Sequence, residues 1–93
     1  MTDRGGRLRL APHVRFRLDE QTGDWFLLYP ERGLRLNATG TAVVRLLTGE
    51  HDLRGIVDRL AADAPAPARA AVEGAVEQFL DRLIERRLVE RVP

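Results

Sequence analysis

The side chains that carry most protein chemistry are scarce in this sequence of 93 residues. Cysteine, lysine and serine do not occur, which excludes disulfides, thiolate metal sites, iron–sulfur clusters, Schiff-base lysines and serine nucleophiles. Two histidines remain, His13 in a strand-like segment and His51 in an expected loop, so a three-histidine catalytic metal centre cannot be built. We therefore expect no catalytic residue, no metal site and no cofactor in this chain.

Charged side chains are abundant but nearly balanced. Fifteen basic and 14 acidic residues leave a formal net charge of +1, so the chain as a whole has no field that would attract a polyanion. The carboxylates fall mostly on expected polar helix faces and in turns, and they do not converge in a pocket as acid–base catalysis requires. The composition therefore disfavours an enzyme and predicts no nucleic-acid partner.

The most informative side chains lie on a long helix that is predicted to begin at about Pro67. Its polar surface carries an acidic row, Glu73, Glu77, Asp81 and Glu85, and beside it a polar-to-basic row, Gln78, Arg82 and Arg86. A solvated face in which Arg82 pairs with Glu85 is the simplest explanation of the acidic row. The basic row borders the apolar stripe next to Ala75 and Phe79. Together these four residues, Ala75, Phe79, Arg82 and Arg86, would make one wall of a groove.

The elements that must position this wall begin with strands in the first 37 residues. Val14, Phe16 and Leu18 alternate with charged residues, Trp25 to Tyr29 is continuously apolar, and Leu34 to Leu36 resumes the alternation. Turn residues separate the three segments, which predicts an antiparallel three-stranded meander. A shorter alternation over 7–10 is expected to be an edge extension, because Ala11-Pro12 separates it from the first strand.

From Asn37 onward the apolar residues follow the helical period instead. Asn37 is a favourable N-cap for a helix over roughly 38–48 that Gly49 closes, and Asp52 caps a second helix. Pro65 and Pro67 interrupt the pattern before the third helix, and 88–89 is expected to be a tail strand or final turn. The prediction is an α+β, winged helix-turn-helix-like fold: a three-stranded antiparallel sheet followed by a three-helix bundle, in one domain over 1–93.

Folds of this kind often read DNA with the third helix. Here the N-terminal half of that helix offers Arg69, Glu73 and Glu77, and two carboxylates would repel phosphates rather than bind them. A local basic character remains at the end of the sheet, from Arg7, Arg9, Arg15, Arg17, Arg32 and Arg35. DNA binding is therefore the lesser hypothesis.

A run of residues in the second and third strands resembles a known family. Leu27, Leu28, Tyr29, Pro30 and Glu31, followed at a fixed distance by Leu36 and Asn37, are similar to the signature of the pyrroloquinoline quinone (PQQ) biosynthesis protein D (PqqD) family. The similarity continues through Gly49, Ile56, Val57, Leu60, Phe79, Leu80, Leu83, Leu88 and Val89, and it covers about residues 8–92. Two positions depart from the family pattern. Arg32 stands between the Pro-Glu pair and Gly33, and Arg87 replaces a glycine near the end of the third helix.

The resemblance implies a non-catalytic peptide chaperone. Such a protein binds a ribosomally made, leader-bearing precursor peptide and presents it to a radical S-adenosylmethionine (SAM) enzyme, which joins a glutamate to a tyrosine in that peptide. The iron–sulfur chemistry then belongs to the partner. Recognition domains of other ribosomal-peptide (RiPP) pathways share the strand-Leu-Asn-helix framework, so a recognition element of another such pathway is the alternative.

The expected peptide site combines the edge of the third strand with the third helix. An uncovered sheet edge can accept a further strand, whose main-chain hydrogen bonds give affinity while side-chain pockets give sequence choice. The residues expected to bind are Gly33, Leu34, Arg35 and Leu36 on the strand, and Ala75, Phe79, Arg82 and Arg86 on the helix. The alternative for Leu34 and Leu36 is a place in the ordinary core, which the alternation of the strand favours for at least one of them.

The surroundings of the protein are also predicted. No signal-peptide-like N-terminus and no run of about 18 apolar residues occur, which predicts a soluble, cytoplasmic protein without a membrane partner. A bare sheet edge can pair with a second copy of the chain, so both a monomer and a homodimer are compatible with the sequence.

Overall fold

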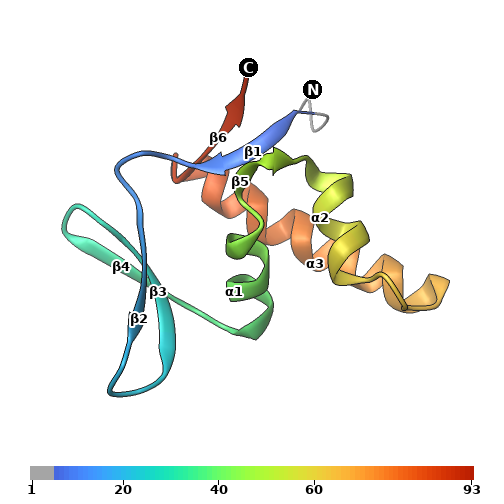
Figure 1. The fold of residues 1–93 in the computed structure, drawn as a ribbon, viewed down its shortest axis with the longest axis horizontal. Helices are drawn as coiled ribbons and strands as arrows, with labels where there is room; N and C mark the ends of the chain where they lie inside the picture. The colour runs from blue at the N-terminus through green and yellow to red at the C-terminus, as the bar shows by residue number, and fades with distance from the viewer. Residues whose placement is uncertain (1–5) are drawn as a thin grey trace.

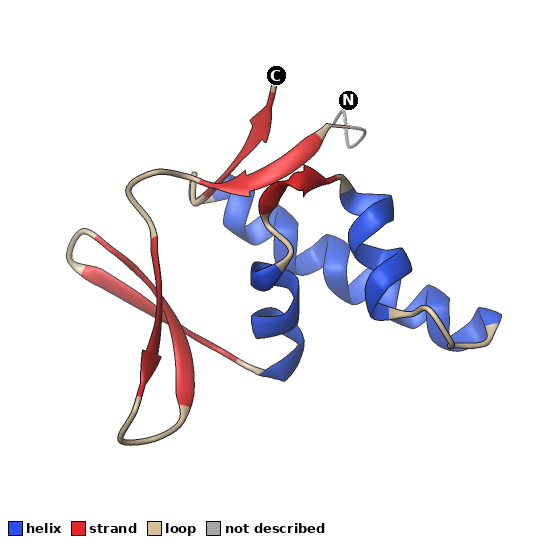
Figure 2. Cartoon of the chain, in the orientation of Figure 1, coloured by secondary structure: helices blue, strands red, loops and turns tan. Residues whose placement is uncertain are grey.

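The computed structural model describes residues 6–93 of the chain. In chain order its elements are β1 (Arg7–Leu10), β2 (Arg15–Asp19), β3 (Asp24–Tyr29), β4 (Arg32–Leu36), α1 (Ala38–Arg45), β5 (Thr48–His51), α2 (Leu53–Leu60), α3 (Ala66–Glu85) and β6 (Val89–Val92). The strands form two separate sheets: β2, β3 and β4 lie at the left of Figure 1, and the shorter β1, β5 and β6 lie above the helices. Figure 2 shows the same division between strands and helices.

The first sheet is the predicted meander, with the order β2-β3-β4 and both pairs antiparallel. Phe16 lies opposite Leu27, and Leu27 lies opposite Leu34, so these three side chains share one face of the sheet. Leu27 is completely buried, which identifies this as the face that packs on the core. The predicted α+β class is confirmed.

The second sheet corrects the expectation for residues 7–10. These residues form β1, which is the central strand of the order β5-β1-β6 rather than an extension of the first sheet. Leu10 lies opposite Val89, and Leu8 is buried. The cause is the corner after β1, where the amide of Val14 donates to the carbonyl of Ala11 (3.0 Å) and the chain leaves one sheet for the other.

The segment after α1 also differs from the prediction. The helix ends at Arg45, with Leu46 as its C-cap, so Gly49 does not close it. Gly49 lies instead within β5, with φ of 91°, and His51 is the last residue of that strand rather than part of a loop. A short segment with glycine at its centre has weak strand propensity. It forms a strand here because it pairs with β1.

The caps of the first two helices follow the predicted chemistry. The side chain of Asn37 accepts a hydrogen bond from the amide of Gly40 (2.7 Å), and the side chain of Asp52 accepts one from Gly55 (2.8 Å). The third helix has no such side-chain cap and begins after Pro65, with a proline in its first turn. Each helix therefore starts where the sequence provides a capping side chain or a proline.

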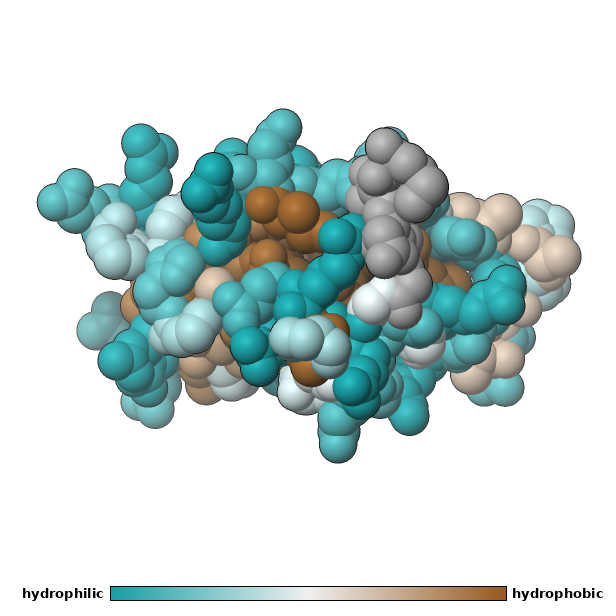
Figure 3. Space-filling model, turned by 90° about the horizontal axis from the view of Figure 1, so that it is seen from above, coloured by the Kyte–Doolittle hydropathy of each residue, from teal (hydrophilic) through white to brown (hydrophobic). Residues whose placement is uncertain are grey.

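One hydrophobic core joins both sheets to the three helices. Its completely or almost completely buried side chains come from β3, α1, α2, α3 and the segment after α3: Leu27, Val43, Ile56, Val57, Val76, Leu83 and Leu88. Most of the surface seen from above is hydrophilic, and brown hydrophobic side chains show mainly in a restricted area near the middle (Figure 3). Burial of the apolar side chains is the dominant stabilising term in such a domain.

Both departures from the family pattern fall at or beside residues with a left-handed backbone. Glu31 has φ of 66° in the two-residue turn between β3 and β4, where a proline followed by a positive φ is the arrangement of a type II turn. Arg87 has φ of 63° just after α3. Its amide donates to Ile84 and the next amide, of Leu88, donates to Leu83 (both 2.9 Å), which together form a Schellman motif. Glycine is the residue that such positions favour.

We expect Arg87→Gly to stabilise the protein. Relief of the left-handed strain outweighs the extra backbone entropy of glycine, giving about 1 kcal/mol and a rise in Tm of roughly 4–8 °C. The control is Arg86→Gly, because Arg86 has an ordinary φ of −87° and should lose stability on the same change. Thermal unfolding of both variants measures the difference, and a Tm for Arg87→Gly at or below that of the parent would contradict it.

Candidate functional site

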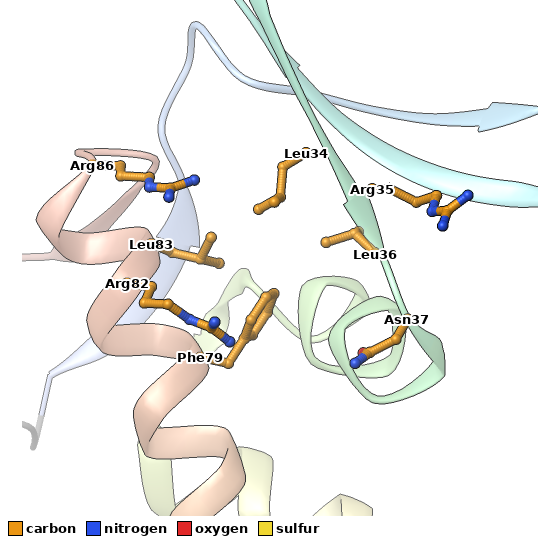
Figure 4. A pocket seen from close by; sticks show the side chains of 8 residues that line it. All are labelled: Leu34, Arg35, Leu36, Asn37, Phe79, Arg82, Leu83 and Arg86. Carbon is orange, nitrogen blue, oxygen red and sulfur yellow. The ribbon is translucent and has the colours of Figure 1, made fainter.

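A groove of about 230 Å³ runs between β4 and the C-terminal half of α3. Its lining comes from these two elements and from the residue that follows β4: Leu34, Arg35, Leu36, Asn37, Phe79, Arg82, Leu83 and Arg86. In Figure 4 the side chains of Leu34 and Leu36 point toward α3, whereas Arg35 points to the opposite side of the strand. The strand therefore contributes apolar side chains to the groove and a cation to its outer margin.

The strand side of the groove is a sheet edge. Within residues 6–93, β4 pairs only with β3, so the other side of its backbone has no strand partner. Buried backbone amides and carbonyls need hydrogen bonds, and those at an edge are available to an incoming chain. The geometry of this edge therefore suits the addition of one more strand.

The helix side follows from the helical period. Phe79, Arg82, Leu83 and Arg86 are spaced i, i+3, i+4 and i+7, so they lie on one face of α3. Leu83 is completely buried and forms the floor, Phe79 is half-buried, and the two arginines are exposed at the rim. Leu83 is not among the residues predicted to bind a peptide, although its spacing from Phe79 and Arg86 places it on the same face of the helix.

The ring of Phe79 rests against α1. A Cβ atom built on Gly40 would lie 3.2 Å from Cζ of Phe79 and 3.2 Å from Oδ1 of Asn37, which is closer than ordinary contact. Glycine at position 40 thus lets the aromatic ring approach the first turn of α1. That approach fixes how far the ring projects into the groove.

The charges around the groove are positive. No acidic residue lines it, and in the described part of the chain neither Arg82 nor Arg86 has a carboxylate within ion-pair distance. The expected pair between Arg82 and Glu85 is therefore not formed. Arg35 contacts Asp24 at 3.5 Å, but its side chain is 70% exposed, so solvent screens this pair. An apolar floor with a cationic rim favours an extended chain that carries an apolar side chain and a carboxylate.

Two of the predicted peptide-binding residues lie outside the groove lining. Gly33 belongs to β4 but is exposed on the other face of the strand. Ala75 is exposed on α3, one turn before Phe79, and does not line the groove. Leu34, Arg35, Leu36, Phe79, Arg82 and Arg86 are brought together around one cavity.

The motif residues of the second and third strands shape the edge of the groove. Leu27 is in the core, Leu28 is exposed on the opposite face of β3, and Tyr29 packs partly buried against the core. The turn at 30–31 directs β4 back along β3, and Asn37 ends that strand while capping α1. The residues of the family motif thus fix where β4 lies relative to α1 and α3.

A second pocket lies on the other side of Leu36 and Asn37, between the start of β3 and α1. Its most distinctive feature is the Arg45 guanidinium, whose carbon lies 5.0 Å from the centroid of the Trp25 ring. The Trp25 ring also stacks on Phe16, with centroids 4.5 Å apart. The sequence predicts no role for Arg45, because only the packing of α1 brings its guanidinium to the Trp25 ring.

The histidines do not form a site. His13 is exposed in the turn before β2, and Nδ1 of His51 accepts a hydrogen bond from Nε of Arg59 at 3.4 Å. Among residues 6–93 there is no cluster of three or more histidine, aspartate or glutamate side chains that could hold a metal ion. No helix in the same part of the chain is long and apolar enough to cross a membrane.

Comparison with known proteins gives one consistent family. The family model for coenzyme PQQ synthesis protein D (PqqD) matches residues 24–89. The protein from Rhizobium meliloti named PqqA binding protein is 36% identical over 88 residues, covering 91% of this chain and 86% of the relative. The protein of the same name from Methylococcus capsulatus is 29% identical over 85 residues, covering 91% and 88%.

Two solved structures share the fold. The solution structure of the PqqD portion of Methylobacterium extorquens PqqCD, described as a functional and stand-alone RiPP recognition element, superposes with a TM-score of 0.72 and 32% identity, covering 90% of this chain and 88% of that chain. The heterocyclase TruD superposes with a TM-score of 0.66 and 23% identity over 94% of this chain, but over 12% of its own length. This second likeness shows the fold alone.

We expect Gly40→Ala to displace the Phe79 ring into the groove. The added methyl group needs a few tenths of an ångström, and the ring has open space on its groove side. Methyl chemical shifts of Leu36 and Leu83, which line the same groove, report the ring position by NMR. Gly74→Ala is the control, because a Cβ there meets nothing within 4 Å, and it should leave these shifts unchanged. Unchanged shifts in Gly40→Ala would mean that the backbone moves instead.

Proposed function

The chain belongs to the PqqD family, and we propose that it is a non-catalytic chaperone that binds the PqqA precursor peptide in PQQ biosynthesis. The observation that carries this proposal is the edge strand β4 facing the apolar floor of the groove. Relatives that carry the name PqqA binding protein align over nine-tenths of the chain and support the same ligand.

Binding proceeds by strand addition. The precursor peptide pairs with the free side of β4, and its alternate side chains enter the groove against Leu83 and Phe79. Main-chain hydrogen bonds provide affinity that is independent of sequence, and the groove provides selection. The proposed contact residues are Gly33, Leu34, Arg35, Leu36, Phe79, Arg82 and Arg86, with Ala75 at the border.

Selection combines an apolar anchor with a carboxylate. The half-buried ring of Phe79 offers contact to an apolar side chain, while Arg82 and Arg86 lie one turn apart at the exposed rim. A peptide whose acidic residue lies close to its apolar anchor satisfies the ring and the guanidiniums together.

The bound peptide is then presented to a radical SAM enzyme, which performs the cross-linking of glutamate and tyrosine. The iron–sulfur cluster and S-adenosylmethionine belong to that enzyme, and this chain contributes no catalytic group or cofactor. The functional unit is a single recognition domain over 1–93 with its core at about 8–92, acting in the cytoplasm as a monomer or homodimer. The core that links β1 near the start of the chain to β6 near its end supports one unit.

Two other functions are less well supported. A recognition element of another RiPP pathway would use the same groove with a different peptide, and the family match favours the PQQ pathway. DNA reading by α3 requires free cations near its N-terminus. Arg69 is the cation available there, and its guanidinium is already paired with the carboxylate of Asp58.

We expect amide chemical shifts to locate the peptide at β4 and α3. In a titration with the co-encoded precursor peptide, the largest changes should fall on 32–37 and 79–86, because those backbones border the groove. Amides of β6 and of α2, away from the groove, are the internal control. Largest changes on β2, the opposite edge of the same sheet, would reject strand addition at β4.

We also expect Phe79→Ala to weaken peptide binding more than Arg82→Ala. A buried ring that anchors an interface is worth about 2 kcal/mol or more, whereas an exposed ion pair is worth roughly 0–1 kcal/mol. Calorimetric titrations at low and high salt measure both variants, with Arg54→Ala on α2 as the control. The arginine variant should mainly lose the salt dependence of binding.

The opposite ranking has a clear signature. A loss for Arg82→Ala that equals or exceeds the loss for Phe79→Ala, and that persists at high salt, would mean that the guanidinium is buried against the peptide. The ring would then not be the principal anchor.

A further inference from the structure

The β2-β3-β4 sheet has a second face that points away from the core. The pairing places Phe26 between Arg17 and Arg35, and Leu28 between Arg15 and Gly33, all on this side of the sheet. We call these six residues the outer face. The basic character that the sequence shows at the end of the sheet is thus arranged around two apolar side chains of the central strand.

The apolar part of the outer face reaches the edge strand. Leu28 is 40% exposed, and its Cδ2 atom lies 3.3 Å from the position that a Cβ atom of Gly33 would take. Because Gly33 has no side chain, Leu28 extends over β4. Between β3 and β2 lies a shallow hollow of about 300 Å³, lined by Arg17, Leu18, Asp19, Phe26 and Leu28. The side chain of Leu18 in this hollow is 44% exposed.

The arginines on this face are available to a partner. Within residues 6–93, Arg15 and Arg17 have no carboxylate within ion-pair distance, and both are exposed. Arg35 contacts Asp24 only at 3.5 Å. Asp19 accepts a hydrogen bond from the amide of Gln21 (3.0 Å), so its charge is directed into the turn. The outer face is therefore an apolar strip with cations on both flanks, complementary to apolar residues surrounded by carboxylates.

We infer that the outer face docks an acidic surface of the enzyme that receives the peptide. This inference rests on the proposed function. A peptide strand added to β4 extends the sheet, so every second side chain of the peptide lies on the same side as Leu28 and Phe26. A protein that covers the outer face then also contacts the peptide. The groove face holds the peptide, while the outer face holds the enzyme.

Two variants test the surface by different means. Arg15→Glu combined with Arg17→Glu reverses the flank, and Leu28→Ser removes the apolar contact that reaches β4. The control combines Arg7→Glu on β1 with Arg54→Glu on α2, which changes the net charge equally at exposed positions on other elements. Amide spectra show whether each variant keeps its fold.

The probes are the co-encoded radical SAM enzyme and the co-encoded precursor peptide, titrated separately by calorimetry. We expect both outer-face variants to weaken enzyme binding by about tenfold or more, with peptide affinity unchanged to within about twofold. The charge-reversed pair should also lose the salt dependence of enzyme binding. The control should bind enzyme and peptide like the parent.

Several results would overturn the inference. Enzyme affinities equal to the control in both variants would reject the surface. Binding of duplex DNA or of phosphatidylserine vesicles that disappears in the charge-reversed pair, with enzyme binding intact, would assign the arginines to a different ligand. If the parent protein does not bind the peptide, the proposed function is rejected. The docking surface is still tested in that case, because the enzyme is titrated in the absence of peptide.

Discussion

The groove depends on the hydrophobic core, in which Leu36 of β4 and Leu83 of α3 are buried in one cluster. A hydrogen bond from the amide of Ala11 to the carbonyl of Leu88 (2.9 Å) adds a backbone contact between the two layers. Ala11 marks the corner where the chain leaves the second sheet for the first, and Leu88 is the buried residue that follows the last turn of α3. The bond therefore ties the end of the helix to the start of the meander. Together with the core, this bond keeps β4 in place beside α3.

The features that sequence analysis predicted well are those decided within a few residues. Asn37 and Asp52 cap helices because their side chains bond to amides three positions ahead. The meander follows from alternation and turns. The second sheet was missed because β1 pairs with β5 and β6, which lie about 40 and 80 positions away in the sequence, and each of these strands has only four residues. Long-range pairing of short strands leaves almost no local signal.

The candidate site shows the same limit. The helical period by itself places Phe79, Arg82 and Arg86 on one face of α3, and it remains a prediction that they contact a peptide. The period does not determine how a helix is rotated against its neighbours. For this reason Ala75 was expected in the site although it does not line the groove, and the partnership between Arg45 and Trp25 was not anticipated. Both depend on how α1 and α3 pack.

The junction at Asn37 limits the reach of recognition. This residue ends β4 and its side chain begins α1, so the backbone changes from extended to helical within one position. At the other end, β4 begins directly after the turn at 30–31, so the strand is only five residues long. An added chain can therefore run in register for roughly 17 Å, at about 3.4 Å per residue, before it must leave the sheet. If a longer precursor peptide pairs with β4 over this short stretch, the rest of the peptide stays free to move while the paired segment remains bound.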